Sequence, residues 1–158
     1  MLGTALAVSV LQQSGGVETL MYYAPIVFGL AGVQGRSGTL LMTMLMMAVK
    51  TACIVVASFG VDRLGRRPLL VVSNAGMAIA LLITAAGFHF EVQALSIGGI
   101  FVFLAVFSLG MGPCCWLYIS EIFPMEVRAN GTTLATAANR FTAALTSATF
   151  LSLIEVVG

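Results

Sequence analysis

Charged residues are scarce in this chain of 158 residues. Lys, Arg, Asp and Glu together account for 8% of it, against roughly 25% in ordinary soluble domains. Hydrophobic residues account for 59%, which is more apolar surface than a soluble domain of this length can bury. The composition therefore excludes an ordinary soluble protein and predicts an all-α membrane protein that crosses the bilayer several times.

Several kinds of functional site lack their residues as well. The chain has one histidine, His89, and its three cysteines lie inside apolar runs without the spacing of metal ligands. Glu18, Glu121 and His89 fall on different runs or loops and form no recognisable catalytic set. The net charge is +1, and only one short loop is strongly basic. We therefore expect no metal, no cofactor, no enzymatic activity and no nucleic-acid partner.

The N-terminal segment lacks the marks of a signal peptide. Residues 1–16 carry no positively charged side chain, and they continue into the apolar stretch 19–28 without a convincing cleavage site. We therefore expect the chain to begin inside a membrane helix, as a fragment or as the product of a truncated gene.

Five apolar runs reach or exceed the roughly 20 residues that an α-helix needs to span a bilayer. The predicted spans cover residues 2–29, 39–60, 69–88, 94–118 and 129–157. Pro25 is expected to bend or end the first helix, and Gly98-Gly99 and the stretch 110–113 to act as hinges in the fourth. A strip of small residues suited to close helix packing lies in the third span: Gly76, Ala80, Thr84 and Gly87.

The charges between these runs indicate an orientation. The loops 62–68 and 120–128 fall on one side of the membrane and hold four arginines, whereas the loops 30–38 and 89–93 on the other side hold one. Because Lys and Arg in short loops stay on the cytoplasmic side, the first side is predicted to be cytoplasmic. Gly65 lets the backbone turn tightly within the first of these loops.

Two of the runs carry polar or small residues on a single helical face. Such a stripe in a membrane helix faces a partner or a water-filled cavity and not lipid. In the first run the stripe is Ser9, Gln12, Gly16, Thr19 and Tyr23. In the fifth run it is Thr132, Thr136, Asn139, Ala143 and Thr146, with Arg140 beside them.

Three groups of motifs follow one another along the chain. The first comprises Gln12-Gln13, Gly16-Val17-Glu18 and Tyr22-Tyr23-Ala24-Pro25. The second is the charged loop with Gly60, Asp62-Arg63, Gly65 and Arg66-Arg67. The third comprises Gly112-Pro113-Cys114-Cys115-Trp116, Ser120-Glu121-Ile122-Phe123-Pro124 and Arg128. In this order and spacing they resemble the sugar porters of the major facilitator superfamily, which implies five transmembrane helices, seven to eleven, from the C-terminal half of such a transporter.

The resemblance also implies a substrate site. Gln12, Gln13, Trp116 and Asn139 match positions that contact sugar in the family, and Glu18, Lys50 and Arg140 occupy such positions with different chemistry. Hexose facilitators usually carry Asn where Glu18 and Lys50 stand, and Trp where Arg140 stands. The chain is therefore most similar to plant polyol and monosaccharide proton symporters.

The chemistry of these residues agrees with substrate binding and leaves alternatives open. Amide side chains donate and accept hydrogen bonds as sugar hydroxyls do, and an indole offers a flat face to a sugar ring. Hydrogen bonds between helices would also explain Gln12, Gln13 and Asn139. An anchor at headgroup level would also explain Trp116.

Two opposite charges lie near the middle of apolar runs, Glu18 in the first and Lys50 in the second. A lone charge at the centre of a membrane helix costs roughly 2.5–3.5 kcal/mol, so we expect the two to form an ion pair beside the substrate. The alternative is that Glu18 carries the coupled proton.

A second cluster of charges falls on the predicted cytoplasmic side. Asp62, Arg66, Arg67, Glu121 and Arg128 match the charges that hold the inner gate shut in the outward-facing state of the family. Opposite charges can pair when the inner mouth closes and separate when it opens. Charge that only sets the topology is the alternative.

The sequence thus predicts transmembrane transport of a monosaccharide or polyol by alternating access, with proton symport. The expected partners are the substrate, the proton, the lipid bilayer and the missing N-terminal half of the transporter. A porter for another small solute, such as inositol or an organic anion attracted by Lys50 and Arg140, is one alternative. A non-transporting sugar sensor or an inactive truncated product is another. The plasma membrane is favoured over the vacuolar membrane or another endomembrane.

Overall fold

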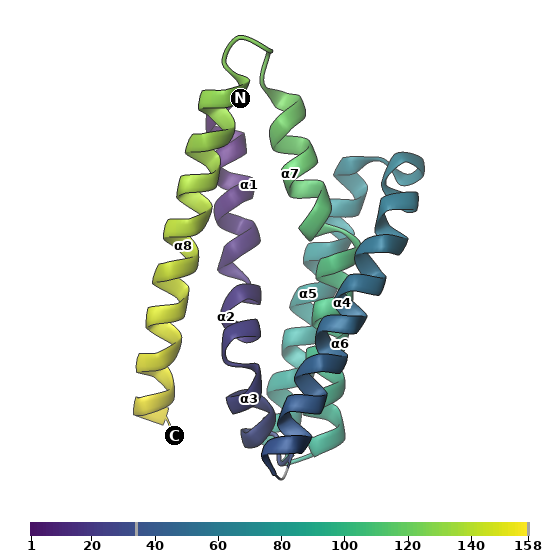
Figure 1. Ribbon diagram of the computed structural model, residues 1–158, viewed down its shortest axis with the longest axis vertical. Coiled ribbons are helices and arrows are strands. Elements are labelled where there is room, and N and C mark those ends of the chain that lie inside the picture. The colour runs from purple at the N-terminus through teal and green to yellow at the C-terminus, as the bar shows by residue number, and fades with distance from the viewer. Residues whose placement is uncertain (34, 158) are drawn as a thin grey trace. The chain divides into compact units, whose positions relative to one another are not determined.

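A computed structural model describes residues 1–33 and 35–157, and the side chains of all of these except 60–64, 66, 67, 151 and 153–157. The described residues form helices and no strand (Figure 1). The helices are α1 (Leu2–Ser14), α2 (Val17–Tyr22), α3 (Ala24–Leu30), α4 (Arg36–Leu64), α5 (Arg66–His89), α6 (Gln93–Leu109), α7 (Met111–Ile122) and α8 (Arg128–Val157). The predicted all-α class is confirmed.

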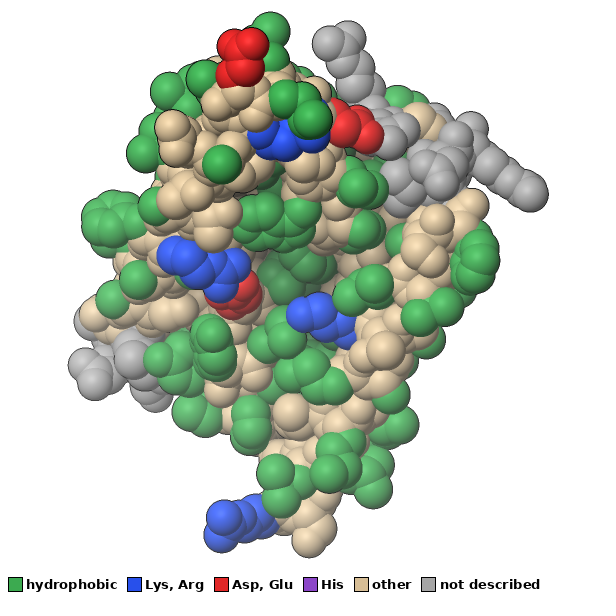
Figure 2. Space-filling view, turned by 45° about the horizontal axis from the view of Figure 1, so that its top comes forward, with side chains coloured by type: hydrophobic (Ala, Val, Ile, Leu, Met, Phe, Trp, Pro, Cys, Tyr) green, Lys and Arg blue, Asp and Glu red, His purple; other side chains and the backbone are tan. Residues whose placement is uncertain are grey.

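Apolar side chains cover much of the surface. Among the residues that the structure describes, three segments are long and apolar enough to cross a bilayer: Arg36–Phe59, Pro68–His89 and Gln93–Ile122. Large side chains such as Met44, Phe59 and Leu82 are more than two-thirds exposed on them, with fractions of 74%, 77% and 71%. Figure 2 shows hydrophobic side chains spread over one face, with few charged ones among them. These segments belong to an integral membrane protein, and the count of five spans stays a prediction.

The first predicted span is divided among three short helices. The chain leaves α1 at Gly15, and Gly16 adopts a φ of +69°, a left-handed conformation that glycine reaches without strain. A second interruption lies at Tyr23, and Pro25 occupies the first turn of α3, where its missing N–H leaves no helical bond unmade. The expected bend near Pro25 is thus present, and the break at Gly15–Gly16 is additional.

The turn between the second and third predicted spans is shorter than expected. α4 continues to Leu64 and α5 begins at Arg66, so that Gly65 is the single residue between them. Its φ of +80° is the left-handed conformation that the tight turn requires. The side chains of Asp62, Arg66 and Arg67 lie outside the described residues.

The chain forms two compact units, of which the first comprises residues 1–22 and 115–158. In it the first and last helices, α1 and α8, lie side by side (Figure 1). Its hydrophobic core contains Ala5, Cys115, Ile119, Phe123 and Ala135. The helices approach closely here, since a Cβ added at Gly131 would lie 2.7 Å from ring atoms of Phe123.

The second unit comprises residues 23–114, and α5 packs along α6 within it. The predicted strip of small residues on α5 lies in this contact, where Gly76, Thr84 and Gly87 meet Val106, Gly99 and Ser96 of α6. Ala80 of the same strip is fully buried. The expectation of close packing through this strip is therefore confirmed.

Candidate functional site

A buried amide network joins α1 to α8 in the first unit. Asn139 on α8 is fully buried and donates from Nδ2 to the backbone carbonyl of Ser9 and to Oε1 of Gln12, both at 2.9 Å. These two bonds use both hydrogens of the Asn139 amide. Ser9, Gln12 and Thr19 are all at most 4% exposed, so the predicted polar face of the first run does turn inward, toward α8. Buried polar groups of this kind need such partners to remain stable.

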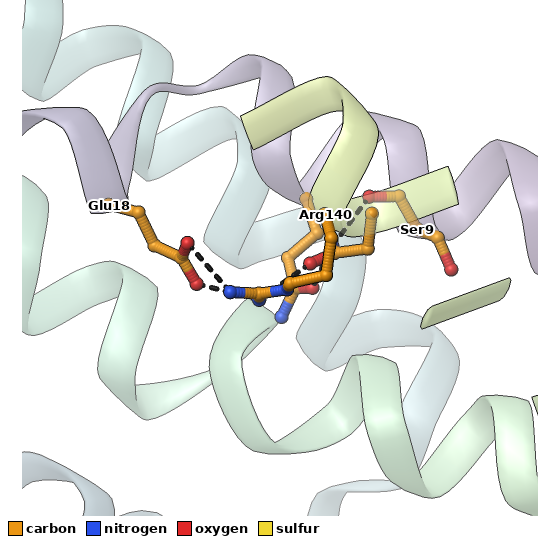
Figure 3. Close-up of polar contacts among 5 residues, drawn as sticks. Ser9, Glu18 and Arg140 are labelled. Carbon is orange, nitrogen blue, oxygen red and sulfur yellow. Dashed lines mark hydrogen bonds and ion pairs between the residues drawn. The ribbon is translucent and has the colours of Figure 1, made fainter. Parts of the chain in front are cut away.

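The neighbouring residue on α8 holds an ion pair to α2. Arg140 donates from Nη1 to Oε2 of Glu18 at 2.8 Å, and its Nη2 lies 2.7 Å from Oε1 of the same carboxylate. Nη2 also donates to Oδ1 of Asn139 at 2.8 Å. Figure 3 shows the guanidinium lying between Glu18 and the amide network. Two parallel bonds to one carboxylate fix the orientation of both side chains.

The exposure of this pair limits what it adds to stability. The Arg140 side chain is 52% exposed and that of Glu18 is 26% exposed. Exposed ion pairs contribute about 0.2–1 kcal/mol, so the pair acts mainly on geometry and charge. The two formal charges cancel, which leaves the network of Ser9, Gln12, Asn139, Arg140 and Glu18 without net charge.

Two buried polar atoms beside this network have no hydrogen-bond partner among the residues that the structure describes. They are Nε2 of Gln13 and Oγ of Ser9. Gln13 is 3% exposed and Ser9 is fully buried. An unpaired buried donor costs about 1–3 kcal/mol, so a ligand hydroxyl that accepts from Gln13 would recover that loss. Gln12 and Gln13 therefore differ in their hydrogen bonding, although they are adjacent in sequence. Gln12 accepts a hydrogen bond within the network, whereas the amide nitrogen of Gln13 makes none among the described residues.

The α2 helix has a second connection to α8. The hydroxyls of Thr19 and Ser147 lie 2.9 Å apart, and either can donate. Asn139 thus connects α8 to α1, before the break at Gly15–Gly16, and Arg140 connects α8 to α2, after it. Ser147 adds a second bond between α8 and α2. Ser9 and Ser147 were not among the predicted site residues. Ser9 lies on the predicted polar face, whereas Ser147 gave no comparable signal.

The other two predicted substrate residues, Trp116 and Lys50, are on other helices. Trp116 is on α7 and is 38% exposed. Lys50 is on α4, in the second unit, and is half-buried. Within the first unit, the cation that binds Glu18 is Arg140. The sequence predicted Lys50 as the partner of Glu18, and a pair between these two residues stays a prediction.

The predicted gate cluster is described only in part. Glu121 is exposed near the end of α7. Arg128 begins α8 and donates from Nε to the carbonyl of Phe123 at 3.3 Å. Since the side chains of its other three members lie outside the described residues, the cluster stays a prediction. Among the described residues, no three His, Cys, Asp or Glu side chains come together as metal ligands.

Comparison with known proteins assigns the family. Residues 1–158 match the model of the family described as sugar (and other) transporter. The chain belongs to this family. It is therefore part of a membrane transporter family and not of an enzyme family, as the motifs predicted.

Relatives and solved structures agree with the match. The chain is 37% identical to "Probable polyol transporter 6" of Arabidopsis thaliana over 98% of its own length and 33% of that protein. A crystal structure of a D-xylose-proton symporter is 30% identical, with a TM-score of 0.88 over 94% of this chain and 34% of that one. The inward open conformation of the xylose transporter XylE from E. coli gives a TM-score of 0.83 at 29% identity over 94% of this chain and 31% of that one. The chain thus spans about a third of the relatives that it matches, and the similarity confirms the sugar porter resemblance and the fold of a major facilitator superfamily transporter.

Proposed function

We propose that this chain forms part of the substrate pathway of a porter that moves a monosaccharide or polyol across a membrane by alternating access. The observation that carries the proposal is the polar network of the first unit, together with the unpaired amide of Gln13 beside it. A polyhydroxylated substrate offers many groups that both donate and accept. A rigid cluster of amides with a spare buried donor suits such a substrate.

The break between α1 and α2 supports alternating access at the same place. Transporters commonly form their substrate sites at discontinuous membrane helices, where backbone groups and side chains are free to bind. The chain is interrupted at Gly15–Gly16, between Gln13 on one side and Glu18 on the other. The substrate of this porter would therefore bind beside the interruption.

Proton coupling is proposed from similarity, since a D-xylose-proton symporter is among the matching structures. In this chain Glu18 is the acidic group of the network. Because its carboxylate accepts from Arg140, the ion pair favours a positioning or substrate-binding role for Glu18 over a role as proton carrier. The proton-carrying group would then lie in another part of the porter.

The charge of the network argues against an organic anion as its ligand. Arg140 was one of two cations that could attract an anion, and its charge is balanced by Glu18. Lys50 is the other, and we propose that it contributes to the substrate region with Trp116, as the resemblance implies. A neutral sugar, hexitol or inositol therefore fits the network better than a sugar acid.

We propose the cytoplasmic charges Asp62, Arg66, Arg67, Glu121 and Arg128 as the latch of the inner gate, and the plasma membrane as the location. Both proposals rest on the family resemblance. Opposite charges near the membrane surface are weak as single pairs, so the latch would act through the whole cluster.

Uptake into proteoliposomes tests the function. The protein is expressed from the full open reading frame that contains this sequence, and labelled pentose, hexitol, inositol and sugar acid are offered with and without an inward proton gradient. Uptake of a neutral polyol or sugar, raised by the gradient, is the expected result. Binding of the same compounds without uptake would indicate a sensor. Uptake of the sugar acid alone would favour the organic-anion porter.

A further inference from the structure

A side chain of α5 forms hydrogen bonds on both sides of the break between α6 and α7. Ser73 is 3% exposed, and its Oγ donates to the carbonyl of Val106, in the last turn of α6, at 2.8 Å. The same Oγ accepts a hydrogen bond from the backbone N–H of Met111, the first residue of α7, at 3.0 Å. A single hydroxyl therefore holds the end of one helix and the start of the next. All of these residues lie in the second unit.

The break itself is built into the backbone. Gly110 has φ −130° and ψ −75°, which is not helical. A Cβ at this position would lie 2.5 Å from Cβ of Ser73 and 3.0 Å from the carbonyl oxygen of Leu69, so the close approach of α5 requires glycine. Pro113 follows in the first turn of α7 and has no N–H with which to continue the hydrogen-bond ladder of α6.

The residue after Ser73 also reaches the start of α7. Nδ2 of Asn74 donates to the carbonyl of Leu70 at 3.0 Å and lies 3.6 Å from Sδ of Met111. Met111 is almost fully buried, at 1% exposure. Two neighbouring side chains of α5 thus contact the residue from which α7 starts.

We propose that Ser73 is a positioning residue for transport, because its hydroxyl holds together the last turn of α6 and the first residue of α7. Donors in the first turn of a helix lack intrahelical partners, and Ser73 supplies one to Met111. A bond from a side chain can break and re-form without unwinding a helix, so the joint can occupy two discrete arrangements. Ser73 therefore governs how fast the porter changes conformation, and has little effect on how tightly it binds its substrate. This consequence for transport rests on the proposed function, whereas the hydrogen bond to Met111 does not.

Hydrogen exchange tests the bond in the protein expressed from the full open reading frame. Ser73→Ala removes both hydrogen bonds, and Ser108→Ala is the matched control. Ser108 is fully buried on α6 next to the break, but its Oγ donates to the carbonyl of Leu104 at 2.7 Å, within its own helix. Ser73→Ala should speed exchange of the Met111 amide about 2- to 10-fold, and Ser108→Ala should leave that amide unchanged.

Transport kinetics test the consequence. Ser73→Ala should change the maximal rate of uptake by about threefold or more while the equilibrium dissociation constant stays within about twofold. Ser73→Thr, which keeps the hydroxyl, should restore the rate at least in part. If the Ser73→Ala protein is not produced in a measurable amount, Ser73→Cys is measured in the same way. It should show a smaller effect of the same kind, since a thiol is a weak donor and acceptor.

The results separate the two claims. Unchanged exchange at Met111 in Ser73→Ala, or an equal change in Ser108→Ala, would overturn the role of Ser73. A Ser73→Ala variant in which the maximal rate and the substrate affinity fall together would also overturn that role. No uptake by the unsubstituted protein would overturn the proposed function and leave the exchange result to stand by itself.

Discussion

At the scale of single residues, Gln12 and Gln13 are neighbours with different hydrogen bonding. Oε1 of Gln12 accepts from Asn139, whereas Nε2 of Gln13 has no partner among the described residues. The first residue therefore contributes to the folded state, and we propose that the second binds the substrate. Their substitution should separate binding from stability.

Gln13→Ala should raise the apparent KM for the sugar or polyol about 2- to 10-fold, because one hydrogen bond to the substrate is lost. The thermal stability of the protein should not fall, since the substitution removes an unpaired buried donor. Uptake kinetics and thermal unfolding in detergent measure the two effects.

Gln12→Ala and Asn139→Ala are the matched comparison. Gln12→Ala leaves one Asn139 hydrogen without an acceptor and should destabilise the protein by about 1–3 kcal/mol. Asn139→Ala should both destabilise and raise KM, because Arg140 and Gln12 lose a common partner. If Gln13→Ala lowers stability as much as Gln12→Ala and leaves KM unaltered, Gln13 is a packing residue.

The partner of Glu18 can be identified by exchanging charges. Glu18→Arg and Arg140→Glu should each lower uptake about tenfold or more, and the double exchange should recover part of it. The recovery is expected because the two side chains are in direct contact, with 2.7 Å between Nη2 of Arg140 and Oε1 of Glu18. Uptake rates per molecule of protein are the measurement.

The same experiment with Lys50 is the control. Recovery in Glu18→Lys with Lys50→Glu, and none in the Arg140 exchange, would replace Arg140 by Lys50 as the partner. Glu18→Gln separates a further alternative: a variant that exchanges substrate but no longer accumulates it against a proton gradient would make Glu18 the proton carrier.

At the scale of helices, two adjacent glycines of α6 meet different surroundings. A Cβ at Gly99 would overlap Thr84 of α5, whereas a Cβ at Gly98 meets nothing within 4 Å. Gly99→Ala should therefore push α5 and α6 apart and cost about 1–3 kcal/mol of stability. Gly98→Ala should be neutral or stabilising by about 0.5–1 kcal/mol, because alanine favours the helix. Equal thermal unfolding of the two variants would contradict the packing of α5 on α6 through this strip.

Much of this helix architecture follows from the sequence. The strip of small residues on α5 predicted a close contact because only small side chains let membrane helices approach. The hinge predicted at residues 110–113 corresponds to the break at Gly110, since a glycine and a proline together weaken the helical ladder. The hinge predicted at Gly98-Gly99 is wrong, because both glycines lie within the unbroken helix α6. Close contact with Thr84 of α5 explains the glycine at position 99 instead.

The break at Gly15–Gly16 could not be predicted in this way. The polar stripe of the first run continues across it with helical spacing, so the pattern indicated one helix. What stabilises the interrupted form is the set of bonds from α8, namely those of Asn139, Arg140 and Ser147. Such bonds between residues more than 120 positions apart are not visible in local sequence.

The sequence likewise predicted some contacts of the candidate site and not others. Matching polar stripes on the first and fifth runs predicted that Gln12 and Asn139 would face inward, and they bind each other. The sequence predicted Lys50 as the partner of Glu18, but an ion pair depends on which helices are neighbours, and local sequence does not show this. In the first unit α2 contacts α8, and Arg140 of α8 binds Glu18.

At the scale of the whole molecule, the gate latch predicts a shift between conformations. Glu121→Gln removes one acidic partner from the cytoplasmic cluster and should shift the porter toward the inward-open state. Cysteines placed in the inner vestibule should then label faster, and those in the outer vestibule more slowly. Glu126→Gln is the matched control, because Glu126 is an exposed acid in the adjoining loop between α7 and α8 and is not part of the cluster. Equal labelling of both variants and the parent would leave the charges with a role in topology only.

The central claim is that a neutral polyhydroxylated substrate binds beside the break between α1 and α2, against Gln13. An electron-density or cryo-electron-microscopy map of the protein from the full open reading frame, with a bound hexitol or pentose, tests this most directly. We predict a substrate hydroxyl within hydrogen-bond distance of Nε2 of Gln13, with the Glu18–Arg140 pair at the edge of the same site. Substrate density that lies away from Gln13, Glu18 and Arg140 would contradict the account.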